Sequence, residues 1–175
     1  MKRSLCWLVV AMMLFCVIAS GGCGGSSSGG GDSDSDSSKN YDPSILEGSW
    51  YASSGSGTAT GPDGTFDLRM TFARASFSNV QSRNNSVSAV VSASAEWDAY
   101  QNGFYIRTIP LSYSNEAIEI QRVSGNTWRY TFPSSQSKIT VKITSETSAA
   151  VVEEGNFRLG SYLYQYKASY TISKQ

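Results

Sequence analysis

The chain has 175 residues, a formal net charge of zero and no histidine. The lack of histidine excludes Ser-His-Asp and Cys-His catalytic pairs and histidine metal sites, and the scattered Lys and Arg residues form no basic stripe for nucleic acid. Cys6 and Cys16 lie in an N-terminal apolar run, which leaves only Cys23 for a mature chain and excludes an internal disulfide or a thiolate cluster. We expect no enzymatic activity, no cofactor and no metal.

The first residues have the pattern of an export signal. Lys2 and Arg3 supply a positive start, and Leu5–Ile18 is apolar throughout. This run fits the roughly 7–15 residues of a signal peptide and falls short of the roughly 20 that cross a bilayer as a helix. We therefore predict a signal peptide over residues 1–22.

Small residues then lead to a single cysteine, in the order Ala19-Ser20-Gly21-Gly22-Cys23. This resembles the lipobox of bacterial lipoproteins, although an aliphatic residue usually stands where Ser20 is. The resemblance implies that Cys23 is lipidated and anchors the chain to a membrane in the cell envelope, outside the cytoplasm, at the outer membrane or cell surface. The alternative is an ordinary signal peptide cut nearby, which would leave Cys23 as a free thiol.

Residues 23–40 are predicted to be the anchor and a flexible linker, because the segment after Cys23 is nearly all Gly, Ser and Asp and has almost nothing to bury. The alternating acids Asp32, Asp34 and Asp36 lack the glycine and closing glutamate of an EF-hand loop. We interpret them as acidic residues that keep the linker solvated and not as a calcium site.

Residues 41–175 are predicted to form one domain of strands. The first strand, Leu46–Thr60, contains small residues that would allow it to bend, and a turn follows at 61–64. The next strand alternates, with four apolar residues expected on its dry face: Phe66, Leu68, Met70 and Phe72. The alternation slips near Ala73–Ala75, which suggests a bulge.

A turn at Arg83-Asn84-Asn85 is followed by the clearest strand. Its inward residues are Val87, Ala89, Val91, Ala93, Ala95 and Trp97. The alanines leave volume that a large neighbour or a ligand must occupy. After a turn at 101–103, we expect three strands, at Phe104–Leu111, Ala117–Val123 and Thr127–Phe132, with a hairpin turn at 124–126 between the last two.

The last part is predicted as strands Ser137–Thr144 and Ala149–Val152, a polar turn at Glu153-Glu154-Gly155-Asn156, and a strand Phe157–Ile172 rich in tyrosine. The fold class is therefore all-β. A single antiparallel up-and-down β-barrel of about eight to ten strands is favoured, because closure removes exposed strand edges, and a β-sandwich is the alternative.

The sequence Gly48-Ser49-Trp50 at the start of the first strand resembles the calycin architecture, most nearly the lipocalin-like domains of bacterial lipoproteins. The resemblance implies that Gly48 and Trp50 are structural, with the tryptophan at the closed end of the barrel beneath a basic residue from a late strand. Arg158 and Lys167 are the two candidates for that residue. The first hairpin is also similar to that of avidin-type barrels, without a later tryptophan motif to support a biotin site.

Three aromatic residues, Trp97, Trp128 and Tyr130, are candidates for the wall of a pocket for a small hydrophobic ligand. Filling of the barrel core is the favoured interpretation, since about eight strands enclose little more than side chains. The tyrosines of the last strand could line the barrel, stack on sugars or contact a partner, and sequence leaves these open. Glu96 and Asp98 share a face, but we interpret them as exposed acids and not as a glycosidase pair.

Overall fold

The computed structural model describes residues 41–83 and 86–175. The predicted signal peptide, Cys23 and the linker lie outside the described residues, as do Asn84 and Asn85 of the predicted turn. No helix among the described residues is long and apolar enough to cross a membrane.

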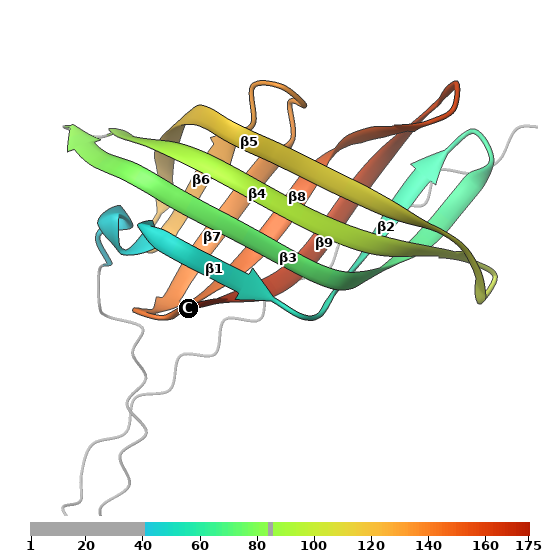
Figure 1. The fold of residues 1–175 in the computed structure, drawn as a ribbon, viewed down its shortest axis with the longest axis horizontal. Helices are drawn as coiled ribbons and strands as arrows, with labels where there is room; N and C mark the ends of the chain where they lie inside the picture. The colour runs from blue at the N-terminus through green and yellow to red at the C-terminus, as the bar shows by residue number, and fades with distance from the viewer. Residues whose placement is uncertain (1–40, 84–85) are drawn as a thin grey trace, which may run out of the picture. The chain divides into compact units, whose positions relative to one another are not determined.

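Within residues 41–83 and 86–175, one short 3₁₀-helix, η1, precedes nine strands (Figure 1). Their bounds are η1 Pro43–Leu46, β1 Gly48–Ala52, β2 Gly55–Gly61, β3 Gly64–Arg83, β4 Ser86–Gln101, β5 Phe104–Ser124, β6 Thr127–Thr131, β7 Lys138–Ser145, β8 Ser148–Leu159 and β9 Tyr162–Lys174. The expected all-β class is confirmed.

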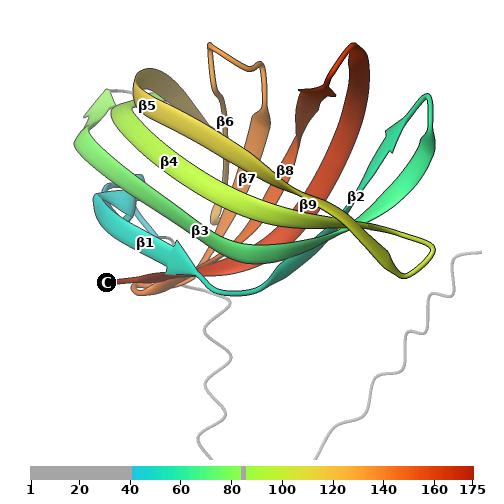
Figure 2. The same ribbon diagram turned by 45° about the vertical axis from the view of Figure 1, so that its right-hand side comes forward.

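All strand pairings in the described residues are antiparallel. The sheet closes on itself because β3, which pairs with the β1–β2 segment at one end of the strand order, also pairs with β4 at the other end. β1 and β2 each pair with β3 and with β9, so the two strands occupy one place in the ring (Figure 2). The predicted bend in the first strand is this interruption at Ser53 and Ser54. The single up-and-down barrel is confirmed, and the β-sandwich alternative is wrong.

The barrel core contains the inward faces predicted for β4, β6 and β7. On β4, Val87, Ala89, Val91 and Trp97 are buried. The prediction for Phe72 is wrong. The register of β3 shifts between Met70 and Phe72, before the expected bulge position, so Ala73 turns inward and Phe72 lies among the outer residues beside Arg74.

Two breaks expected between strands do not occur. β5 is one continuous strand, in which a bulge takes up the polar residues near Asn115, whose φ is +52°. β8 continues through the residues expected to form a polar turn, and the chain reverses at Gly160 and Ser161 instead. The turn prediction at 153–156 is therefore wrong, and β8 instead places Glu153 inside the barrel.

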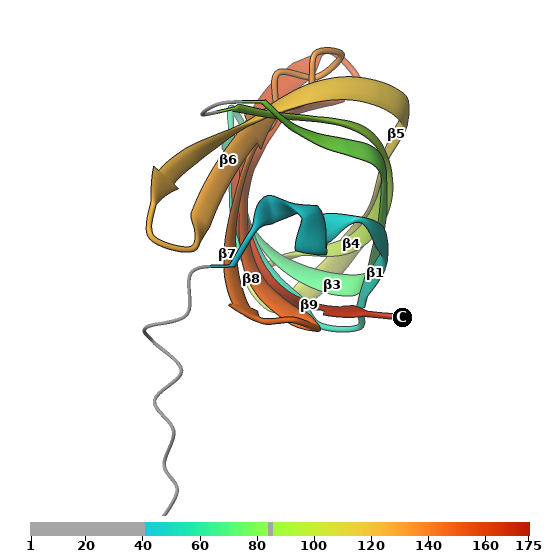
Figure 3. The same ribbon diagram turned by 90° about the vertical axis from the view of Figure 1, so that its left-hand side faces the viewer.

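One end of the barrel is covered by η1 (Figure 3). Leu46 is fully buried there, and its carbonyl accepts a hydrogen bond from the Trp50 indole at 2.7 Å. The basic residue over the Trp50 ring is Lys174, with Nζ 5.7 Å from the ring centroid. The expected position of Trp50 is confirmed, but both proposed basic partners, Arg158 and Lys167, are wrong.

Candidate functional site

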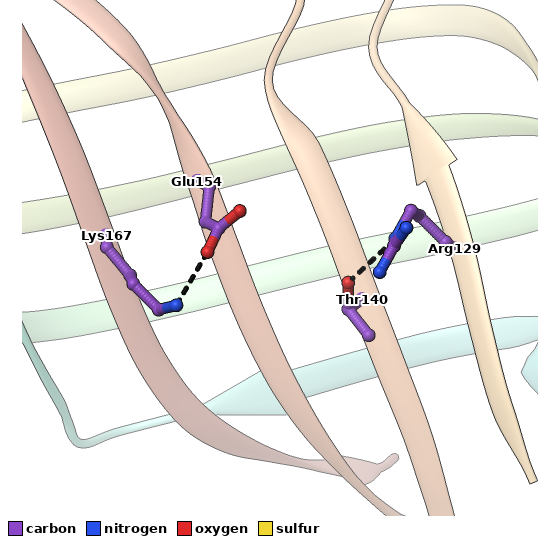
Figure 4. Close-up of polar contacts among 4 residues, drawn as sticks. All are labelled: Arg129, Thr140, Glu154 and Lys167. Atoms are coloured by element: carbon purple, nitrogen blue, oxygen red, sulfur yellow. Dashed lines mark hydrogen bonds and ion pairs between the residues drawn. The ribbon is translucent and has the colours of Figure 1, made fainter. Parts of the chain in front are cut away.

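A buried carboxylate, Glu153, lies inside the barrel. The inward positions of β8 are Ala149, Val151 and Glu153, each two residues apart, so the strand period that buries the first two also buries the acid. Only 3% of Glu153 is exposed. The adjacent Glu154 points outward and forms an ion pair with Lys167 at 2.7 Å (Figure 4).

Tyrosine hydroxyls from β9 hold both oxygens of Glu153. The Tyr166 hydroxyl donates to Oε1 at 2.6 Å and the Tyr170 hydroxyl donates to Oε2 at 3.2 Å. Ser137 Oγ lies 3.3 Å from the Tyr166 oxygen, and Tyr113 donates to Ser137 Oγ at 3.2 Å. Because the single Tyr166 proton is used on Glu153, the whole chain of donors is directed toward the carboxylate.

Gly155 makes this packing possible. A Cβ at Gly155 would lie 2.5 Å from Ser137 Oγ and 3.0 Å from Tyr166 Cε1. The glycine that suggested a turn in the sequence is therefore a point of close approach inside a strand.

A cavity of about 40 Å³ adjoins Glu153. Its walls combine small residues from β3 and β4 with aromatic residues from β3, β5, β6 and β9. The main lining residues are Ala73, Ala75, Phe77, Ala93, Ala95, Tyr113, Tyr130, Phe132, Glu153 and Tyr170. A cavity needs a volume of roughly 10–15 Å³ to hold one water molecule, so this cavity has room for about three groups the size of water. The volume left by two of the β4 alanines is thus only partly filled.

Burial governs the ionisation of this cluster. It raises the pKa of Glu153 above its ordinary value, and the hydrogen bonds from Tyr166 and Tyr170 act in the opposite direction. Burial and the nearby Glu153 also raise the pKa values of Tyr130, Tyr166 and Tyr170. Desolvation therefore favours the uncharged forms of the cluster.

The three aromatic candidates from the sequence occupy different places. Tyr130 lines the cavity, whereas Trp97 packs edge-on against Tyr170 at a centroid distance of 5.9 Å without lining the cavity. Trp128 is buried two residues before Tyr130 on β6, and the Arg122 guanidinium carbon lies over its ring, 5.5 Å from the centroid. The indole nitrogens of both tryptophans are buried without a hydrogen-bond partner in the described structure.

The tyrosine face of β9 lines the barrel. Tyr164 and Tyr166 are buried, and Tyr162 at the strand start remains about half exposed. An exposed ladder of tyrosines for sugars or partners is therefore absent from β9. Glu96 and Asp98 flank the inward Trp97, and Asp98 accepts a hydrogen bond from Thr108 at 2.7 Å.

Sequence reasoning missed Glu153, Ser137, Tyr166 and Tyr170 as one cluster. The available signal was the alternation Ala149, Val151, Glu153, which continues the strand period into the acid.

No protein-family model matches the chain, and a search of curated proteins also finds no match. Among solved structures, an S-type phycobiliprotein lyase from Guillardia theta is 8% identical with a TM-score of 0.41, covering 75% of this chain and 89% of its own. The siderocalin Ex-FABP is 14% identical with a TM-score of 0.35, covering 75% and 74%. A redesigned β-barrel is 18% identical with a TM-score of 0.31, covering 75% and 93%.

Proposed function

We propose that this protein is a non-enzymatic, lipocalin-like binding barrel that holds a small molecule in the cavity beside Glu153. The observation that carries the proposal is the composition of that cavity. Mostly apolar walls with a few convergent polar groups are typical of small-molecule sites. The alanines of β3 and β4 leave space that larger apolar residues would have filled.

The size of the cavity limits the ligand. About 40 Å³ accommodates a compact molecule or one end of a longer one, and the remainder of the barrel is filled by aromatic and aliphatic side chains. A long-chain lipid would need those side chains to move.

The binding proposal is tested by native mass spectrometry and by thermal denaturation with small ligands. The full-length chain should carry or take up a small molecule, and bound ligand should raise its Tm. Ala93→Leu, which fills the cavity, should abolish the ligand-induced rise. An Ala93→Leu protein that binds as well as the unmodified chain would show that the cavity is not the site.

We further propose that lipid on Cys23 tethers the barrel to a membrane in the cell envelope, outside the cytoplasm. Two or three acyl chains would anchor it firmly, since each buried methylene contributes about 0.8 kcal/mol. The proposal is supported by the charged start, the apolar run and the cysteine after four small residues. The intact mass of protein recovered from cells tests it. Acyl mass lost in Cys23→Ala is expected, and a free Cys23 thiol would overturn it.

A further inference from the structure

We propose that the cavity is selective for a small cationic amine, with Glu153 as its counter-ion. The inference rests on the proposed binding function and specifies the chemical class of the ligand. It is carried by three features of the cluster: an acid without a cationic partner, a surrounding set of aromatic rings, and a space of matching size.

The carboxylate of Glu153 is only partly satisfied. An ionised carboxylate has about four acceptor positions, and the described structure supplies two donors, Tyr166 and Tyr170. No cation of the described residues forms an ion pair with Glu153. Arg74 also lines the cavity, but it is an exposed residue and its guanidinium lies over the rings of Tyr51 and Phe72, 5.7 and 5.8 Å from their centroids. An ionised carboxylate buried without a cation is costly, so the empty site disfavours the charged form and a cationic ligand would supply the missing partner.

Aromatic rings surround the same space. Phe77 and Tyr130 are perpendicular with centroids 6.0 Å apart, and Tyr130 and Phe132 are perpendicular at 5.5 Å. Ring faces attract ammonium groups, most strongly where water is excluded. The rings and Glu153 therefore favour positive charge together, whereas a carboxylate or phosphate ligand would be repelled.

The space suits an amine of about four non-hydrogen atoms, given room for roughly three water-sized groups and small adjustments of the alanine wall. n-Propylammonium is the matching probe. n-Propanol has the same length and no charge, and therefore serves as the matched control ligand.

Binding of the ammonium would be coupled to release of a proton. Burial raises the pKa of Glu153, so the empty site favours the neutral acid. An incoming ammonium ion stabilises the carboxylate, and the carboxyl proton leaves to solvent while the ligand keeps its own protons. The titratable groups that face Glu153 are Tyr113, Tyr130, Tyr166 and Tyr170, and Arg74 lines the same cavity. Burial raises the pKa values of Tyr130, Tyr166 and Tyr170, so these three phenols stay protonated around neutral pH.

The experiment is calorimetric titration of the full-length chain, purified in detergent, with n-propylammonium and with n-propanol. Each titration is run in two buffers of different protonation enthalpy. We expect n-propylammonium to bind at least about tenfold more tightly and to release protons. Glu153→Gln should remove both the preference and the proton release. Lys167→Met, which alters only the outer ion pair, should change neither.

The outcomes separate the two proposals. Equal affinity for the two ligands, or an unchanged preference in Glu153→Gln, would overturn the amine proposal and leave the cavity as a neutral binding site. Binding of neither ligand would overturn both. If Glu153→Gln does not fold, Tyr170→Phe provides the second test, since losing one of two donors to the carboxylate should change the pH at which protons are released.

Discussion

The ammonium group of Lys174 donates a hydrogen bond to the carbonyl of Ile45, with Nζ and O 3.0 Å apart. This contact joins the end of the last strand to η1, which covers the barrel end. The same ammonium lies over the ring of Trp50, and the Trp50 indole donates to Leu46. One cation thus stabilises both the covering segment and the tryptophan beneath it.

Replacing Lys174 by Met should therefore destabilise the barrel by about 1–2 kcal/mol, because a charged hydrogen bond and a cation–π contact are lost together. Chemical denaturation followed by tryptophan fluorescence measures the change. Lys167→Met is the matched control and should cost no more than about 0.5 kcal/mol, since its ion pair is exposed. Equal effects of the two substitutions would contradict the role assigned to Lys174.

The buried acid should give the protein a characteristic pH dependence. Because the pKa of Glu153 is higher in the folded than in the unfolded state, the folded protein binds the extra proton. Its contribution to stability is full below the ordinary carboxyl pKa, about 4.5, and is lost as pH rises through the folded value. Glu153→Gln keeps an acceptor for Tyr166 and cannot ionise, so it should not lose this stability. Melting curves over a pH series test this, and parallel curves for the two proteins would contradict it.

Gly155→Ala should destabilise the barrel by about 1–3 kcal/mol, because the new methyl group would overlap Ser137 Oγ and press on Tyr166. Adding Ser137→Ala removes the closest of these contacts. The double variant should therefore recover part of the lost stability, a positive coupling measurable by denaturation of all four proteins. Additive losses would show that the two residues do not share this contact.

Much of the barrel could be predicted from the sequence, because strand alternation reports directly on inward and outward faces. β4 is the clearest case: Val87, Val91 and Trp97 point inward as expected. Short polar turns were also recognisable, as at Asn102-Gly103, where both residues have positive φ. Each of these features depends on residues that are close together in the sequence, so the sequence pattern alone predicts it.

Several of the errors arose where a residue's role depends on a distant partner. Gly155 beside two acids has the composition of a turn, yet its smallness accommodates Ser137 and Tyr166, which lie on other segments. The cation over Trp50 could not be chosen by motif, since Lys174 reaches it only after the ring closes. The alternation Ala149, Val151, Glu153 indicates an inward acid, but its partners Tyr166 and Tyr170 lie opposite it only once β9 pairs with β8.

A last prediction concerns the β2–β3 turn. The hydroxyl of Tyr164 donates to Asp63 Oδ2 at 2.7 Å, and this hydrogen bond is the main cause that raises the pKa of Tyr164 to about 12. The carboxylate keeps the phenol protonated, so stability from this contact is present below pH 10 and is lost as pH rises toward the folded value. Asp63→Asn removes the negative charge and should lower the Tyr164 pKa toward its ordinary value of 10. Titration of the ring carbon signals by NMR measures the shift. Asp67→Asn, an exposed acid further along β3, is the control and should leave the Tyr164 titration unchanged; a similar fall in both variants would assign the effect to general charge and not to the Asp63 hydrogen bond.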